Sequence, residues 1–124
     1  MTRDQNLLNS FKIAFLGLIS AFKKEKNFRT QCLIGIIVIF FMIVLGLNAI
    51  EKSILLLMIL VVLSLELINS QIEKFLDFIQ PDHHQKVKII KDFSAGAVLL
   101  SAIGSIVIGI LIFLPYIIKL MERG

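Results

Sequence analysis

Three long runs of apolar residues, separated by short polar segments, dominate the pattern of this sequence. The runs cover about residues 32–50, 53–77 and 93–118. Each is close to or longer than the ~20 residues that an α-helix needs to cross the hydrocarbon of a bilayer. We predict three transmembrane helices, because a helix satisfies its backbone hydrogen bonds internally in a medium without water.

The segment before the first run, about residues 6–29, has a different pattern. Apolar side chains recur along it at helical spacing, whereas Lys12, Lys23 and Lys24 lie off that stripe. This pattern is typical of an amphipathic helix that lies along a membrane surface. The predicted fold class is therefore all-α, with an N-terminal surface helix and three spans in a single domain covering residues 1–124.

Composition and charge support an integral membrane protein. Of the 124 residues, 57% are hydrophobic, and the cations behind the net charge of +4 lie beside the apolar runs. Cations placed in this way report topology and do not form a nucleic-acid-binding face. Most of them precede the first run or lie between the second and third runs. By the positive-inside rule, the N-terminus and the second connection are predicted to be cytoplasmic.

The end of the second run places four polar residues on one helical face. Glu66, Asn69, Glu73 and Asp77 follow one another at intervals of three, four and four residues. At ~100° per residue they fall within an arc of about 80°, and they extend about 16 Å along the axis. Ionisable groups inside a span are costly and usually face a bundle interior or a wet cavity. This ladder is a candidate functional site, and a polar seam that only joins helices is the alternative.

Further charged residues are expected at the level of this ladder. Glu25 is the only acid between Asp4 and Glu51, and Lys91 with Asp92 opens the third run. Carboxylates with an Asn oxygen could hold Mg²⁺, and a lysine could neutralise phosphate, which suits phosphoryl transfer. Intramembrane acids also form proton or cation relays. The residue types alone leave two equal alternatives: a membrane enzyme that transfers phosphoryl groups, and a small oligomeric proton or cation transporter.

The third run carries small residues at every fourth position, which allow helices to approach closely. They are Ala97, Ser101, Ser105 and Gly109. Three helices of this size bury little surface between themselves. Both features favour a homo-oligomer, with sites built between subunits.

The ladder, taken with its neighbours, resembles the signature of the small prokaryotic diacylglycerol kinase and undecaprenol kinase family. From Glu66 to Asp77 the chain reads Glu-x-x-Asn-Ser-x-Ile-Glu-x-x-x-Asp, and Lys91 with Asp92 follows after a short loop. The similarity extends upstream and covers nearly the whole chain. The upstream positions are Ala14, Gly17, Ala21, Phe22, Glu25, Asn27, Phe28 and Arg29.

The resemblance implies a homotrimer of three-span subunits that uses MgATP to phosphorylate a membrane lipid alcohol at a composite site. It implies that Glu25 and Glu73 hold the metal ions that bridge the ATP phosphates. It also makes Glu66 the candidate general base for the lipid hydroxyl. The implied location is the bacterial plasma membrane, with the active site on the cytoplasmic side.

The resemblance assigns the nucleotide to a second set of residues. Asn69 would order the site near the transferred phosphate, and Lys91 would contact the ATP phosphates. Asp77 and Asp92 would support nucleotide or metal binding. The closing segment, residues 111–115, is more similar to the undecaprenol kinase branch than to the diacylglycerol kinase branch. Undecaprenol is therefore the expected acceptor, with diacylglycerol as the alternative.

Overall fold

Four α-helices make up the computed structural model, which describes residues 3–82 and 84–124. The helices are α1 (Arg3–Lys24), α2 (Lys26–Val44), α3 (Ala49–Ile79) and α4 (Gln85–Arg123). The described residues contain no strand. Helices α2, α3 and α4 are each long and apolar enough to cross a membrane. The prediction of an all-α chain with three candidate spans is confirmed.

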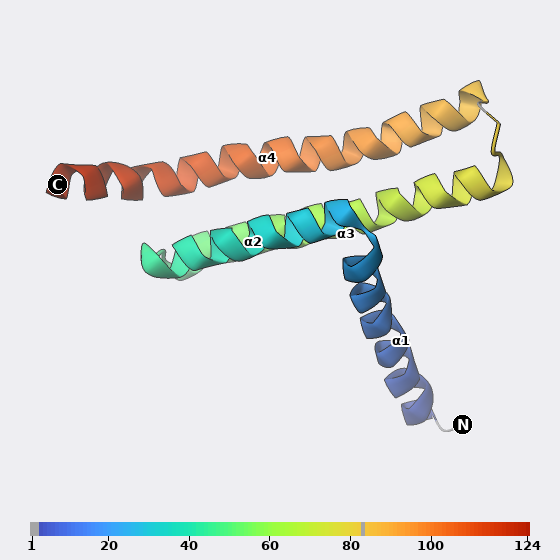
Figure 1. The fold of residues 1–124 in the computed structure, drawn as a ribbon. Coiled ribbons are helices and arrows are strands. Elements are labelled where there is room, and N and C mark those ends of the chain that lie inside the picture. Colours follow the sequence, from blue (N-terminus) through green and yellow to red (C-terminus); the bar gives the residue numbers. More distant parts are fainter. Residues whose placement is uncertain (1–2, 83) are drawn as a thin grey trace.

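The three candidate spans pack in chain order. Helix α2 runs back along the first part of α3, and α4 returns along α3 from the other end, whereas α1 points away from the three spans (Figure 1). Helix α3 continues well beyond the start of α2 (Figure 1). With 31 and 39 residues, α3 and α4 are about 46 Å and 58 Å long. Both exceed the ~30 Å hydrocarbon layer, so parts of each helix reach past it.

The surface helix expected over residues 6–29 is interrupted at Glu25, which corrects its C-terminal boundary. Glu25 has extended backbone angles, φ −103° and ψ 108°, and is the N-cap of α2. Arg29 Nη1 donates hydrogen bonds to the carbonyl oxygens of Phe22, at 3.0 Å, and Lys23, at 2.7 Å. Carbonyls in the last turn of a helix lack partners within it. Arg29 therefore caps α1 from α2 and stabilises the bend between the two helices.

The first span ends at Val44, whereas the apolar pattern had placed its end at residue 50. The chain turns at Gly46, whose φ of 67° is readily adopted only by glycine. Asn48 then starts α3 with a capping box: its side chain accepts a hydrogen bond from Glu51 N at 2.9 Å, and Glu51 Oε1 accepts one from Asn48 N at 3.1 Å. A turn this short and apolar is hidden in a hydropathy pattern.

The apolar turn belongs to the hydrophobic core. Met42, Leu47 and Leu55 are buried together at this end of the bundle. The Tyr116 hydroxyl of α4 donates a hydrogen bond to the carboxylate of Glu51 and ties α4 to the start of α3. In a bilayer the alternative environment is lipid and not water, so close van der Waals packing of these side chains stabilises the contact. The partly buried residues packed against this core are Val38, Ile39, Leu45, Ile108, Ile112, Phe113 and Tyr116.

Glycines behave differently in α2 and α4. A Cβ added at Gly35 of α2 would lie 3.1 Å from Ile59 Cγ2 of α3, so the two helices approach closely there. A Cβ added at Gly96, Gly104 or Gly109 of α4 would meet no atom within 4 Å. The described part of the chain thus uses a glycine for close approach in α2, while those of α4 face open space.

Removal of the Arg29 guanidinium should loosen the bend. Arg29→Gln loses both bonds to the α1 carbonyls, each worth about 1 kcal/mol. We expect amide hydrogen exchange in the last turn of α1 to accelerate about fivefold or more, with exchange around Leu55 unchanged. Lys24→Gln removes a neighbouring charge without these bonds and serves as the control. Equal exchange in the two variants would show that the bend does not depend on Arg29.

Candidate active site

Three polar side chains are buried in α3 at the point where it passes the bend between α1 and α2. Glu66 is 6% exposed, and Asn69 and Ser70 are each 8% exposed. Ser70 Oγ donates a hydrogen bond to the Leu67 carbonyl oxygen at 3.1 Å. Glu73 is half-buried and Asp77 is exposed. The predicted ladder therefore runs from the buried interior of the bundle to its surface.

The Glu66 carboxylate interacts with groups from outside its own turn of helix. The Asn27 amide donates a hydrogen bond to it, and the carboxylates of Glu25 and Glu73 are close enough to repel it. The three acids that were predicted to act together thus converge. Asn27 was not among the predicted site residues, although it lies two positions after Glu25. Its place beside an acid was the signal that could have found it.

Asn69 combines a satisfied donor with an unsatisfied acceptor. Its Nδ2 donates a hydrogen bond to Glu73 Oε1 at 3.4 Å. Its Oδ1 is buried and has no hydrogen-bond partner among the described residues. A buried acceptor without a partner costs about 1–3 kcal/mol. This oxygen is therefore suited to a cation or donor that arrives with a ligand.

These oxygen donors fit Mg²⁺ when it is bound together with phosphate. Among the described residues, no group of three or more His, Cys, Asp or Glu side chains is arranged to hold a metal ion. Mg²⁺ does not require such a cage, because it usually takes one or two carboxylates, several waters and substrate phosphates. Glu25, Glu73 and Asn69 Oδ1 supply donors of the right kind.

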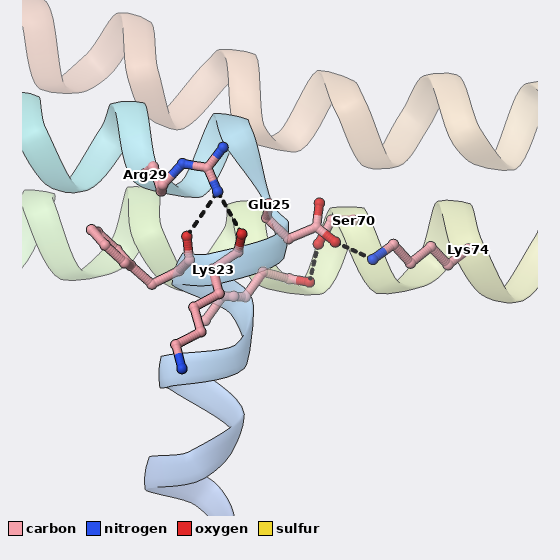
Figure 2. A network of polar contacts seen from close by, with 7 residues as sticks. Lys23, Glu25, Arg29, Ser70 and Lys74 are labelled. Carbon is pink, nitrogen blue, oxygen red and sulfur yellow. Dashed lines mark hydrogen bonds and ion pairs between the residues drawn. The ribbon is translucent and has the colours of Figure 1, made fainter.

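Glu25 has a partner that the sequence pattern did not reveal. Its carboxylate accepts a hydrogen bond from Lys74 Nζ on α3, which joins the bend to that helix (Figure 2). Glu25 makes no side-chain cap to α2, so its carboxylate is free to reach across. The Glu25 side chain is 18% exposed and that of Lys74 is 57% exposed. The sequence carried no signal for Lys74, because a lysine on a helix end is usually a solvated surface residue.

A second group of charges lies further out, where α3 and α4 meet. The Lys91 ammonium forms an ion pair with Asp77 across the two helices. Asp92 pairs instead with Lys88, at 3.0 Å within α4. A pocket of about 640 Å³ opens here, a size typical of small-molecule sites. It is lined by Asp77, Gln80, Pro81, Asp82, His84, Gln85, Val87, Lys88, Lys91 and Asp92.

The two groups of charges are neighbours along α3. Glu73 and Asp77 are four residues apart and so lie one above the other, about 6 Å apart along the axis. On the opposite side of Glu66, an apolar groove of about 500 Å³ lies among α2, α3 and α4. Val62 and Leu63, one helical turn before Glu66, are part of its lining. Glu66 therefore stands between an apolar groove and a charged pocket.

Comparison with known proteins identifies a family for this arrangement. The family model of prokaryotic diacylglycerol kinase matches residues 12–113. A diacylglycerol kinase of Synechocystis is 39% identical over 94% of this chain and 67% of its own length. An undecaprenol kinase of Bacillus subtilis is 37% identical over 90% of this chain and 94% of its own. A diacylglycerol kinase of Haemophilus influenzae is 36% identical over 87% of this chain and 93% of its own.

The matched region contains α2, α3, the bend at Glu25 and most of α4, and with them every predicted site residue. The resemblance noted from the sequence is confirmed. Because the family and these relatives are kinases, phosphoryl transfer is favoured over ion transport, and ATP is the implied co-substrate. The chain belongs to the prokaryotic diacylglycerol kinase family and is a membrane lipid kinase.

Proposed function

We propose that this chain transfers the terminal phosphoryl group of MgATP to undecaprenol, and that diacylglycerol is a poorer acceptor. The observation that carries the proposal is the position of Glu66, a buried acid between the apolar groove and the charged pocket. A lipid alcohol has the same division, with an apolar tail and a single reactive hydroxyl. The curated relatives carry both substrate names, so the preference for undecaprenol rests on residues 111–115.

Glu66 is the proposed general base. It accepts the proton of the lipid hydroxyl, whose oxygen forms a bond to the terminal phosphorus while the bond from that phosphorus to the ADP oxygen breaks. The hydrogen bond from Asn27 orients the carboxylate. Burial of the site excludes water, which would otherwise compete with the lipid hydroxyl for the phosphoryl group.

Glu25 and Glu73 are proposed to hold Mg²⁺, and Asn69 is proposed to order the site near the transferred phosphate, where its Oδ1 can add an oxygen donor. Bound there, Mg²⁺ would neutralise the charge of the phosphate oxygens during transfer. The buried, unpartnered Asn69 Oδ1 supports this assignment. Lys91 is proposed to contact the ATP phosphates from the outer pocket, with Asp77 and Asp92 supporting the nucleotide or its metal.

The proposed assembly is a homotrimer with a cytoplasmic N-terminus and α1 on the membrane surface. Helix α1 has no buried residue and points away from the spans (Figure 1), while its apolar stripe is exposed. A membrane surface would cover that stripe. The open space at Gly96 and Gly104 of α4 leaves room for a helix of another copy. Both features support the proposal, together with the positive-inside distribution of lysines.

Metal binding is tested by Glu25→Gln and Glu73→Gln. Each variant replaces a charged ligand by a neutral one of the same shape, so the Mg²⁺ concentration for half-maximal activity should rise about tenfold or more. Glu122→Gln, an exposed change at the far end of α4, is the control. Light scattering should show the same oligomer throughout. If either site variant retains the wild-type Mg²⁺ dependence, its residue is not a metal ligand.

General-base catalysis is tested by Glu66→Gln. The glutamine keeps the shape but cannot take the hydroxyl proton, so kcat should fall about 10²-fold or more. Nucleotide affinity, measured on the same preparation, should change little. If Glu66 is only a polar tie between helices, glutamine replaces it and turnover stays near normal. Near-normal turnover would therefore remove Glu66 from the reaction.

The acceptor is tested by turnover of undecaprenol and diacylglycerol in the same detergent micelles. Because residues 111–115 resemble the undecaprenol kinase branch, we expect kcat/KM for undecaprenol to exceed that for diacylglycerol about tenfold or more, a difference of ~1.4 kcal/mol. Phosphorylated lipid is quantified by radiolabel transfer from ATP. A reversed preference would make the chain a diacylglycerol kinase, and the absence of product from both lipids would reject this proposal.

A further inference from the structure

Two carboxylates assigned to the metal and nucleotide are each paired with a lysine of the same chain. Glu25 is paired with Lys74, and Asp77 with Lys91. Lys91 already has a proposed role at the ATP phosphates, whereas Lys74 has none. The two pairs lie on neighbouring stretches of α3, because Lys74 and Asp77 are three residues apart and so project from adjacent positions.

Lys74 balances the charge of the site in this structure. The carboxylates of Glu25 and Glu73 both repel that of Glu66, and a cation at contact distance offsets such repulsion. The ammonium of Lys74 is that cation, bonded to Glu25 (Figure 2). It stands where a metal ligated by Glu25 would bring its own positive charge.

The burial of the two partners is unequal. The side chain of Glu25 is 18% exposed, but that of Lys74 is 57% exposed. An acid held by the bend can keep its place while a mostly exposed lysine rotates away, because the lysine stem is flexible and makes three donors available in any direction. Exposed ion pairs are weak, and one of this kind reduces binding of a competing cation only about two- to fivefold.

We propose that Lys74 is a phosphate-binding residue of the kinase site, held by Glu25 when no metal is bound and transferred to the nucleotide phosphates when a divalent cation binds Glu25. The exchange conserves favourable contacts: the carboxylate passes from ammonium to metal, and the ammonium passes from carboxylate to phosphate. With Lys91 of α4, it gives the triphosphate two lysines, each paired with an acid in this structure. This inference rests on the proposed role of Glu25 as a metal ligand.

The alternative is a structural ion pair that fastens the bend to α3. Such a pair would contribute only to stability, and its loss would change the affinities for metal and for nucleotide in the same direction. The proposed exchange makes the two ligands respond in opposite directions. Loss of the lysine removes a competitor of the metal at Glu25, and it also removes a partner of the phosphates.

The test is Lys74→Met in the full chain in lipid nanodiscs. Binding of Mn²⁺ alone is measured by electron paramagnetic resonance, and binding of a non-hydrolysable ATP analogue with Mg²⁺ by calorimetry. We expect Mn²⁺ affinity without nucleotide to rise about two- to fivefold and affinity for the analogue to fall about fivefold or more. Lys74→Arg keeps the charge and should restore most of the nucleotide affinity.

Lys86→Met is the control for the general loss of one positive charge at this end of the molecule. Lys86 forms no ion pair with the described residues and does not line the outer pocket. Both of its affinities should stay within about twofold of the wild type, because Lys86 is exposed and forms no ion pair with Glu25 or Asp77. Equal effects in Lys74→Met and Lys86→Met would overturn the proposal.

A double-mutant cycle separates this inference from the function on which it rests. With Glu25→Gln, Mn²⁺ binding should weaken, and Lys74→Met added to it should bring no gain in Mn²⁺ affinity. Wild-type Mn²⁺ binding in Glu25→Gln would refute the metal role of Glu25 itself. Weakened binding there, with Lys74→Met unchanged in both affinities, would refute only the exchange. Tighter Mn²⁺ with unchanged nucleotide affinity would refute the phosphate role.

Discussion

The structure depends on the burial of a carboxylate and an amide within the helix that forms the centre of the bundle. Glu66 and Asn69 are more than nine-tenths buried on α3, although their neighbours in sequence are mostly apolar. A buried charge without partners is costly, so other elements must supply partners at this level. Asn27 does so from the first turn of α2, and it can because the chain bends at Glu25. The bend is in turn held by Arg29, which bonds the last carbonyls of α1.

The polar groups form a graded series from the interior of the bundle outward. Glu66 has little access to water, Glu73 has some, and Asp77 is exposed. The same gradient suits a reaction between a lipid hydroxyl and a water-soluble nucleotide, because a lipid acceptor would enter from the apolar side and a nucleotide from the charged side. Family membership establishes that the chain is a lipid kinase, and the gradient gives a physical reason for a kinase built from so little protein.

Ion pairs have a particular place in this arrangement. The pairs Glu25 with Lys74 and Asp77 with Lys91 involve side chains that are at least partly exposed, so each contributes little to the free energy of unfolding. These pairs keep oppositely charged side chains close together but do not fix them in one position. A site for a metal and a triphosphate would need acids for the metal and lysines for the phosphates. A weak ion pair keeps an acid and a lysine close to the site and is easily broken when either binds a ligand.

The sequence by itself determined the helical class, the three spans, the polar ladder and the family. Hydrophobic length and helical spacing are local properties, and the residues from Glu66 to Asp77, followed after a loop by Lys91 and Asp92, form a signature that can be read along the chain. It misplaced the end of the first span, because Leu45 and Leu47 keep the turn apolar. It also extended the surface helix through Glu25, because helical spacing does not reveal a bend capped from the next helix.

Only the tertiary structure decided which charged side chains meet. Lys74 and Glu25 are 49 positions apart, and Asn27 reaches Glu66 from another helix. Such contacts depend on how α2 and the bend pack against α3, and no period along the chain encodes them. The unpartnered oxygen of Asn69 likewise emerges only when its surroundings are known, because burial is set by the neighbours that fold against a residue.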